Sequence, residues 1–269
     1  MHLLPDFMMS GTTFQRSAHI GGSLTSPSLI VIHYTGSGGT DGKGDAGWFQ
    51  DPNSKVSAHF IVGRDGSIIQ SVPCNRVAWH AGKSIWKGKP NCNGFSIGIE
   101  VDNWGLLTKA ADGKFYPPSK NAKPIAPSDV VEINGRYWER FPQAQVEATA
   151  QLVKALREGI ASLKDIAGHR DIAPGRKIDP GDAWPMRAMN GMTEDRSSPT
   201  NPEFAKVTAS SLNVRASASA EAKKIGKLAK GEAVEIIYEQ PGWALIKPVV
   251  PSFLQGINEG WVSSQYLQK

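Results

Sequence analysis

The sequence predicts an α/β domain with a mixed central β-sheet and flanking helices, followed by a small all-β barrel. Three observations support this fold class. Strand-like apolar runs alternate with a helical pattern over 1–190, a polar stretch with two prolines fills 191–202, and short strand-like segments dominate 203–269. We therefore expect a first domain over 1–190 with its core at 29–185, a linker over 191–202, and a second domain over 203–269. A chain of 269 residues is long enough for one or two domains.

The strands of the first domain are predicted from apolar runs and turn residues. Residues 29–32, Leu-Ile-Val-Ile, form a short apolar run typical of a buried strand. Residues 57–63 and 67–72 flank an Asp-Gly turn, which predicts an antiparallel hairpin. Residues 95–101 alternate with period 2, so Glu100 is expected on the polar face of a strand.

A helix is predicted over 142–160, because Val146, Ala150 and Val153 fall on one apolar stripe and Pro142 suits the first helical position. The stretch before it, about 105–140, is long and rich in Pro, Lys and Asn. We interpret it as an insertion, either a substrate-facing lid or a structureless surface loop.

The second domain shows a different pattern of short strand candidates separated by turn residues. These segments are 207–214, 233–238, 243–246 and 260–262. Their spacing predicts a small barrel built only of strands.

Charge and hydropathy exclude several classes of protein. The 30 Lys and Arg exceed the 25 Asp and Glu by five, and the excess is spread along the chain, so we expect no nucleic-acid partner. Apolar runs are far shorter than the ~20 residues of a membrane span, and residues 1–10 lack the pattern of a signal peptide. Cys74 and Cys92 allow one bridge or two free thiols, and free thiols are favoured.

Two segments carry residues suited to metal binding. His33 closes the apolar run at 29–32, and the Gly- and Pro-stiffened segment 168–181 contains His169, Lys177 and Asp179. Catalytic zinc prefers three protein ligands and an open position, and two imidazoles with a carboxylate supply that set. The spacing differs from a His-Glu-x-x-His helix, and a strand-end histidine alone is more often structural.

Five segments in order resemble the zinc-dependent N-acetylmuramoyl-L-alanine amidases, which are related to phage lysozyme-type amidases and peptidoglycan recognition proteins. The matching segments are Ile32-His33-Tyr34-Thr35, Val56-Ser57-Ala58-His59-Phe60, Ala78-Trp79-His80-Ala81-Gly82, Phe95-Ser96-Ile97-Gly98-Ile99-Glu100 and the segment 168–181. The resemblance covers most of residues 29–185.

The resemblance implies a set of roles. In that family the corresponding residues hold zinc, so His33, His169 and Asp179 are the expected metal ligands. It also implies catalytic roles for Glu100 and Lys177. The chemistry agrees, since Glu100 can transfer a proton, Lys177 can stabilise an oxyanion, and zinc activates water. The bond cut would be the amide between N-acetylmuramic acid and L-alanine.

Three further residues are candidates for substrate binding: Trp79, His80 and Tyr34. For His80, lining of the groove and structural packing are equally consistent with the sequence. His59 lies within a predicted strand, and packing in the core is favoured for it over metal binding.

The C-terminal segment resembles a bacterial SH3-like domain, which implies an SH3-like barrel that binds cell-wall peptides. Four pieces carry this resemblance: residues 212–217, 231–236, 242–246 and 259–267. Residues 247–258 interrupt the usual pattern.

The expected function is therefore zinc-dependent amide hydrolysis in peptidoglycan or its muropeptide fragments, by a monomer without a membrane span. Two alternatives remain: a non-catalytic peptidoglycan-binding protein on the same scaffold, and a metallopeptidase that cuts within the stem peptide. We expect action on the bacterial cell wall, in the periplasm or outside the cell. Cytoplasmic recycling of muropeptides and phage-encoded release are the other settings that the sequence leaves open.

Overall fold

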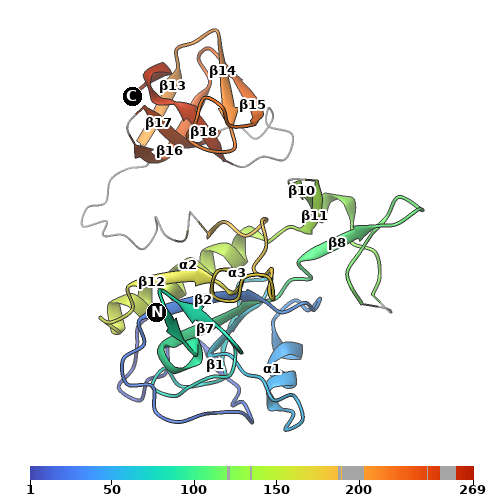
Figure 1. Ribbon diagram of the computed structural model, residues 1–269, viewed down its shortest axis with the longest axis vertical. Helices are drawn as coiled ribbons and strands as arrows, with labels where there is room; N and C mark the ends of the chain where they lie inside the picture. Colours follow the sequence, from blue (N-terminus) through green and yellow to red (C-terminus); the bar gives the residue numbers. More distant parts are fainter. Residues whose placement is uncertain (120–121, 134, 187–188, 190–202, 241, 249–258) are drawn as a thin grey trace. The chain divides into compact units, whose positions relative to one another are not determined.

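The computed structural model describes residues 1–119, 122–133, 135–186, 189, 203–240, 242–248 and 259–269 (Figure 1). The chain divides into two compact units, 1–193 and 194–269. The expected linker at 191–202 lies outside the described residues. None of the helices within the described ranges is long and apolar enough to cross a bilayer.

The first unit is built on a mixed six-stranded sheet, which confirms the predicted α/β class. Four adjacent strands run parallel, β3, β7, β2 and the edge strand β12, and β4 pairs with β3 in the predicted antiparallel hairpin. In sheet order the strands are β1 (Thr13–Phe14), β4 (Ile68–Gln70), β3 (Phe60–Val62), β7 (Ser96–Val101), β2 (Leu29–Tyr34) and β12 (Asp165–Gly168). The predicted segment at 57–63 thus contains a strand of only three residues.

Both faces of the sheet are covered, because the central strands are buried on each side. Helix α2 (Gln143–Gly159) packs its apolar stripe against one face, where Ile30, Ile32 and Ile97 lie (Figure 1). Pro142 is the N-cap residue of this helix rather than its first residue, so the helix begins one position later than expected. The opposite face carries Leu29 and Val31.

Two shorter helices lie against this second face. Helix α3 (His169–Ile172) buries Ile172 beside β2, and helix α1 (Lys43–Gln50) buries Phe49 near β3 and β4. Smaller elements complete the unit: β5 (Ile85–Trp86), β6 (Lys89–Pro90), and the 3₁₀ turns η1 (Cys92–Phe95) and η2 (Pro127–Asp129). Cys74 and Cys92 are buried free thiols, as favoured from the sequence.

The insertion at about 105–140 forms an antiparallel four-stranded sheet, so its interpretation as a structureless loop is wrong. Its strands in sheet order are β10 (Val130–Ile133), β11 (Arg136–Glu139), β8 (Leu106–Lys109) and β9 (Phe115–Tyr116). Aromatic residues hold it together and in place: Phe115 packs on Tyr137 at 4.9 Å between ring centroids, and Trp138 is 1% exposed.

The second unit is an all-antiparallel sheet around its own apolar core, as the SH3-like prediction requires. The expected strand at 207–214 is divided in two by a turn. In sheet order the strands are β15 (Lys224–Ala229), β14 (Ser211–Arg215), β18 (Gly260–Ser263), β17 (Trp243–Pro248), β16 (Ala233–Gln240), β13 (Glu203–Val207) and β19 (Leu267–Gln268), with the 3₁₀ turn η4 (Ser264–Tyr266) before the last. Most of the interrupting segment 247–258 lies outside the described residues.

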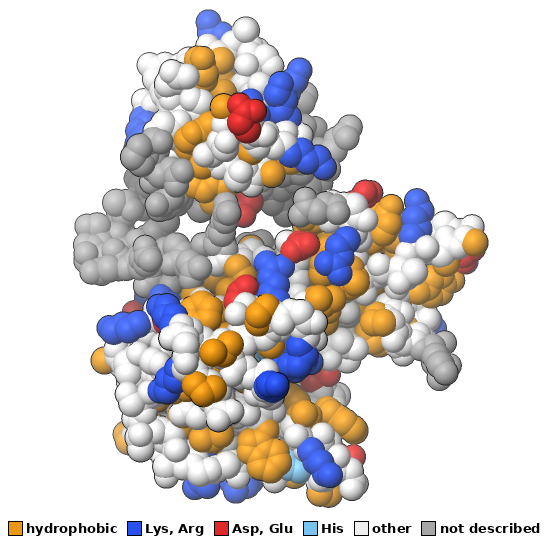
Figure 2. Space-filling model, in the orientation of Figure 1, with side chains coloured by type: hydrophobic (Ala, Val, Ile, Leu, Met, Phe, Trp, Pro, Cys, Tyr) orange, Lys and Arg blue, Asp and Glu red, His pale blue; other side chains and the backbone are white. Residues whose placement is uncertain are grey.

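Charged side chains are dispersed among other residues on the one face that Figure 2 draws. On the face drawn in Figure 2, Lys and Arg lie scattered among uncharged and acidic side chains rather than gathered in one patch.

Candidate metal centre

The candidate site lies where parallel strands end. His33 in β2 and Glu100 in β7 are direct partners in the strand register, so their side chains share a face of the sheet. His169 follows β12, whose last residue, Gly168, pairs with Ile32 of β2. The carboxyl ends of adjacent parallel strands meet at one edge, which is where open α/β sheets bind ligands.

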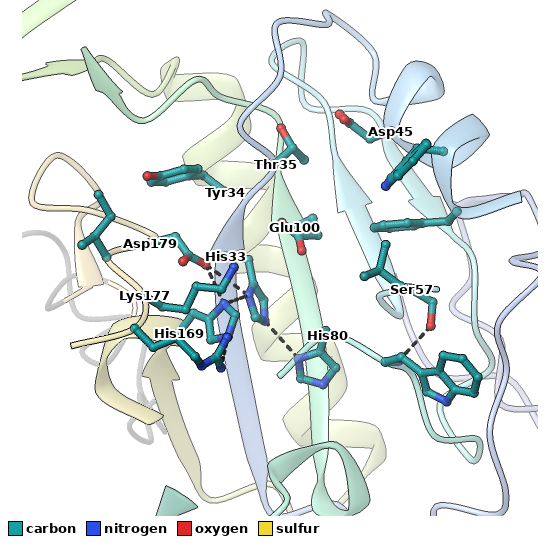
Figure 3. A pocket seen from close by; sticks show the side chains of 16 residues that line it. His33, Tyr34, Thr35, Asp45, Ser57, His80, Glu100, His169, Lys177 and Asp179 are labelled. Atoms are coloured by element: carbon teal, nitrogen blue, oxygen red, sulfur yellow. Dashed lines mark hydrogen bonds and ion pairs between the residues drawn. The ribbon is translucent and has the colours of Figure 1, made fainter. Parts of the chain in front are cut away.

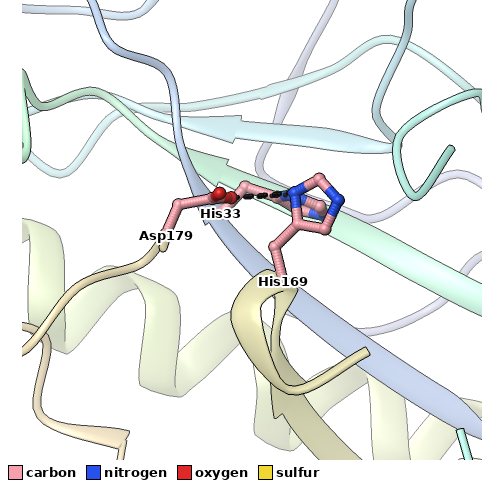
Figure 4. A group of neighbouring side chains, drawn as sticks. All are labelled: His33, His169 and Asp179. Atoms are coloured by element: carbon pink, nitrogen blue, oxygen red, sulfur yellow. Dashed lines mark hydrogen bonds and ion pairs between the residues drawn. The ribbon is translucent and has the colours of Figure 1, made fainter. Parts of the chain in front are cut away.

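His33, His169 and Asp179 form a compact cluster with buried side chains (Figure 4). The Nδ1 atoms of the two histidines are 2.8 Å apart. Asp179 Oδ2 lies 2.9 Å from Nδ1 of His169 and 3.2 Å from Nδ1 of His33. Residues separated by up to 146 positions therefore present three ligand atoms to one point.

The segment that carries Asp179 is held by its own backbone and side chains. The Arg170 N–H donates to the Asp179 carbonyl at 2.8 Å, and Asp171 Oδ2 accepts from the Gly168 N–H at 2.7 Å. Asp171 thereby closes the turn between β12 and α3. These contacts bring Asp179 back beside His169, ten positions earlier in the chain.

The cluster has the charge states that a metal ion needs. Burial lowers the pKa of His33 to about 4, although the neighbouring Asp179 carboxylate opposes this shift. Burial alone would raise the pKa of Asp179, but the His169 and His33 rings beside its carboxylate hold that pKa below its ordinary value. A neutral imidazole beside an ionised carboxylate is the form in which both residues coordinate metals.

Glu100 lies beside the cluster as an unpaired acid. Its Oε2 is shielded from solvent and has no hydrogen-bond partner among the described residues. Burial raises the pKa of Glu100 well above its ordinary value, and the nearby charges of Asp179 and Asp45 add to the effect. A carboxyl group with a raised pKa can exchange a proton near neutral pH, as a general acid or base must.

The cluster and Glu100 open into a groove of about 520 Å³ (Figure 3). Lys177 is exposed, lines this groove, and lies on the same loop as Asp179. The structure thus brings together the five residues that the sequence suggested as ligands or catalytic groups.

Trp79 and Tyr34, two of the substrate-binding candidates, also line the groove. Trp79 is 42% exposed and its ring stacks on His19 at 5.1 Å between centroids. Tyr34 is half-buried, and its ring lies directly against the backbone of Gly105, where an added Cβ atom would clash with it. Tyr34 therefore also contacts the start of the inserted sheet.

His80 touches the groove but its ring nitrogens already have partners. Nδ1 lies 3.0 Å from Nε2 of His33, and Nε2 lies 3.1 Å from the hydroxyl of Ser96. His59 is fully buried, accepts from the Gly98 N–H and contacts the Arg76 carbonyl, so it packs in the core as expected.

Asp45 was not predicted from the sequence, although it lines the groove. Burial raises its pKa to about 6, while a hydrogen bond from the Ser37 hydroxyl opposes the shift. It lies on helix α1 within a stretch without any motif, so no local signal pointed to it.

The fold and the site define a class of protein: an α/β domain with a buried His-His-Asp cluster and a free acid at the end of parallel strands. The sequence profile of the N-acetylmuramoyl-L-alanine amidases matches residues 23–182, and that of bacterial SH3 domains matches residues 210–268. The chain belongs to the N-acetylmuramoyl-L-alanine amidase family and carries a C-terminal bacterial SH3 domain.

Individual relatives agree with this family. The chain is 38% identical over 98 residues to the 1,6-anhydro-N-acetylmuramyl-L-alanine amidase AmpD of Citrobacter freundii, which covers 30% of this chain and 51% of AmpD. It is 34% identical over 102 residues to the N-acetylmuramoyl-L-alanine amidase AmiD of Escherichia coli, 35% of each chain. A crystal structure of a selenomethionine AmpD derivative matches with a TM-score of 0.52 and 27% identity, over 71% of this chain and 98% of that one. The matched stretch spans about half of the first relative's length.

Proposed function

We propose that the chain hydrolyses the amide bond between N-acetylmuramic acid and L-alanine in peptidoglycan or its muropeptide fragments. The observation that carries this proposal is the buried cluster of His33, His169 and Asp179, which opens into a groove shared with Glu100 and Lys177. Membership of the amidase family supports the choice of bond.

We assign zinc to the cluster of His33, His169 and Asp179. A tetrahedral zinc ion with bonds of about 2.0–2.1 Å places its ligands about 3.3 Å apart. The three ligand atoms are separated by 2.8–3.2 Å, close to that spacing. Two imidazoles and one carboxylate also leave a fourth position for water, as in catalytic zinc sites.

The other residues of the site divide the chemistry of amide hydrolysis between them. When bound, zinc lowers the pKa of water and polarises a carbonyl group. Glu100 takes the proton of the attacking water and passes it to the departing amine, a task that suits its raised pKa. The ammonium group of Lys177 stabilises the negative charge that develops on the carbonyl oxygen.

The walls of the groove suit a substrate that is part sugar and part peptide. The indole rings of Trp48 and Trp79 are 54% and 42% exposed and line the groove, as does Ile178 at 40%. Flat aromatic surfaces with a polar edge pack on amphipathic ligands. Tyr34 and Trp79 therefore remain our candidates for substrate binding, whereas the ring nitrogens of His80 are occupied within the protein.

We assign the C-terminal unit to binding of the cell wall. A separate apolar core supports its independence from the first unit, and the bacterial SH3 profile covers most of it. The proposed division is an amidase domain over 1–190, a linker over 191–202 and the SH3-like domain over 203–269. With this arrangement the protein acts on the bacterial wall.

The test combines metal analysis with product analysis. Purified protein is assayed for zinc and incubated with intact sacculi and with soluble muropeptides, and products are identified by mass spectrometry. We expect one zinc per chain and release of stem peptides with a free N-terminal L-alanine. We also expect His33→Ala, His169→Ala and Asp179→Ala to lose zinc and turnover together. Cuts within the stem peptide would instead identify a metallopeptidase, and wall binding without zinc or cleavage would identify a binding protein.

A further inference from the structure

The metal-facing histidines are held from behind by one short segment. Because Nδ1 of each ring points into the cluster, Nε2 lies on the far side. Nε2 of His33 is 3.0 Å from Nδ1 of His80, and Nε2 of His169 is 3.2 Å from the carbonyl oxygen of Ala81. Two consecutive residues therefore provide a partner for both rings.

The donor and the acceptor can be assigned for each hydrogen bond behind His33. The series of contacts ends at a backbone carbonyl, and a carbonyl oxygen can only accept. The Ser96 hydroxyl donates to the Cys92 carbonyl at 2.6 Å. Its single proton is thus used, so at 3.1 Å it accepts from Nε2 of His80. A neutral imidazole carries one N–H, which leaves Nδ1 of His80 as an acceptor for the Nε2–H of His33. Nδ1 of His33 is then free of a proton and faces the cluster.

Tight packing fixes the position of the His80 ring. A Cβ atom at Gly98 would lie 2.5 Å from this ring, so the ring rests directly on the backbone of β7. It contacts His33 edge-on at 5.1 Å and His59 at 6.0 Å between ring centroids. The ring cannot turn without displacing these neighbours.

The backbone of the same segment is held from two sides. Asn93 Oδ1 accepts from the N–H groups of His80 at 3.1 Å and Ala81 at 2.7 Å. Arg176 Nη2 donates to the carbonyl groups of Ala81 at 2.7 Å and Lys83 at 2.9 Å. Arg176 and the Nε2–H of His169, which lie 3.3 Å apart, thus share the Ala81 carbonyl as acceptor.

We propose that His80 is a positioning residue that fixes the orientation and the tautomer of His33 for metal binding, and that it does not act by contacting substrate. The proposal rests on the zinc site proposed above. Partners behind a metal-binding histidine orient the ring and increase its basicity, and their loss typically weakens metal affinity by about 10–100-fold.

The test compares His80→Phe, which removes the acceptor, with His80→Asn, whose side-chain oxygen can occupy the place of Nδ1. The matched control is His59→Phe, which removes a buried imidazole whose two ring nitrogens are hydrogen-bonded to backbone groups rather than to the cluster. Zinc affinity is measured on the full chain by competition with a chelator. The tautomer of His33 is read from long-range ¹H–¹⁵N spectra of the metal-free protein.

We expect His33 of the wild-type chain to carry its proton on Nε2 alone. His80→Phe should lose this single tautomer and bind zinc about 10–100-fold more weakly. His80→Asn should recover most of the affinity, and His59→Phe should keep it. An unchanged tautomer and zinc affinity in His80→Phe, or a rise in KM alone, would refute the positioning role. A wild-type chain that binds no zinc would instead refute the proposed function.

Discussion

Replacing Glu100 with Gln should stabilise the metal-free protein while it abolishes most of the activity. The side chain is partly buried, and its Oε2 atom is shielded from solvent without a hydrogen-bond partner in the described part of the chain, close to the negative charges of Asp179 and Asp45. The amide of Gln has nearly the same shape and no charge, so it avoids both burial of charge and repulsion. Turnover should fall by about 10²–10⁴-fold, the usual contribution of a general acid or base.

The pKa of Glu100 limits how much stability the Glu100→Gln variant can gain. The folded protein raises the pKa of Glu100 above its ordinary value of 4.5. Ionised Glu100 therefore lowers the free energy of unfolding, and this loss grows by about 1.4 kcal/mol for each pH unit above 4.5. At pH 7 this cost cannot exceed about 3.5 kcal/mol, and it stops growing above the raised pKa of Glu100, where the folded protein is ionised as well. Wild-type stability should therefore fall between pH 4.5 and 7 relative to the variant, and the difference should vanish at or below pH 4.5.

Urea unfolding of both metal-free proteins across this pH range measures the difference. Glu147→Gln is the matched control, since Glu147 lies exposed on α2 and should change stability by less than about 0.5 kcal/mol at any of these pH values. Zinc should reduce the gain from Glu100→Gln, because the cation offsets the repulsion. A variant that is less stable than the wild type at pH 7, or a difference that does not depend on pH, would show that Glu100 is not a strained acid.

Three other substitutions test separate parts of the site. Lys177→Ala should retain zinc but lower kcat by about 10²–10³-fold, and full turnover would refute its role at the oxyanion. Asp45→Asn should stabilise the chain by about 1–3 kcal/mol at pH 7, because the rise of its pKa from 3.8 to about 6 penalises the ionised form; denaturant titrations should show this gain disappearing near pH 4. Trp138→Ala should destabilise the first unit by about 3–5 kcal/mol. It should also weaken zinc binding, measured by competition with a chelator, because the Trp138 ring packs against Gly181 of the ligand loop.

The central strands could be predicted because their apolar periodicity is local. The alternation at 95–101 correctly placed Glu100 on the less apolar face of β7, but that face is buried, since Ser96 is 0% exposed. Periodicity reports which residues share a face and says nothing of what covers it. The cover comes from α1, α3 and the loop around His80, which lie elsewhere in the chain.

The inserted sheet could not be predicted for a related reason. Its strands contain two to four residues, too few for a periodic signal, and four prolines lie in the connection between β9 and β10. What stabilises it is non-local: Phe115 packs on Tyr137, and Trp138 is buried against Gly181 of the ligand loop. A sequence read segment by segment assigns such a region to a loop.

The metal centre contains residues that a sequence motif can identify and residues that only the tertiary structure can identify. The ligands could be named because a strand end and a stiffened loop each carry the right functional groups. The orientation of those ligands depends on contacts across 47 positions, from His33 to His80, and across 88 positions, from His169 to the Ala81 carbonyl. One of these partners is a backbone atom, for which no residue type is required. A chain with the same three ligands but other contacts at residues 80–81 would therefore keep the motif and lose metal affinity. The ligands together with the groups that orient them are thus stronger support for catalysis than the ligand set alone.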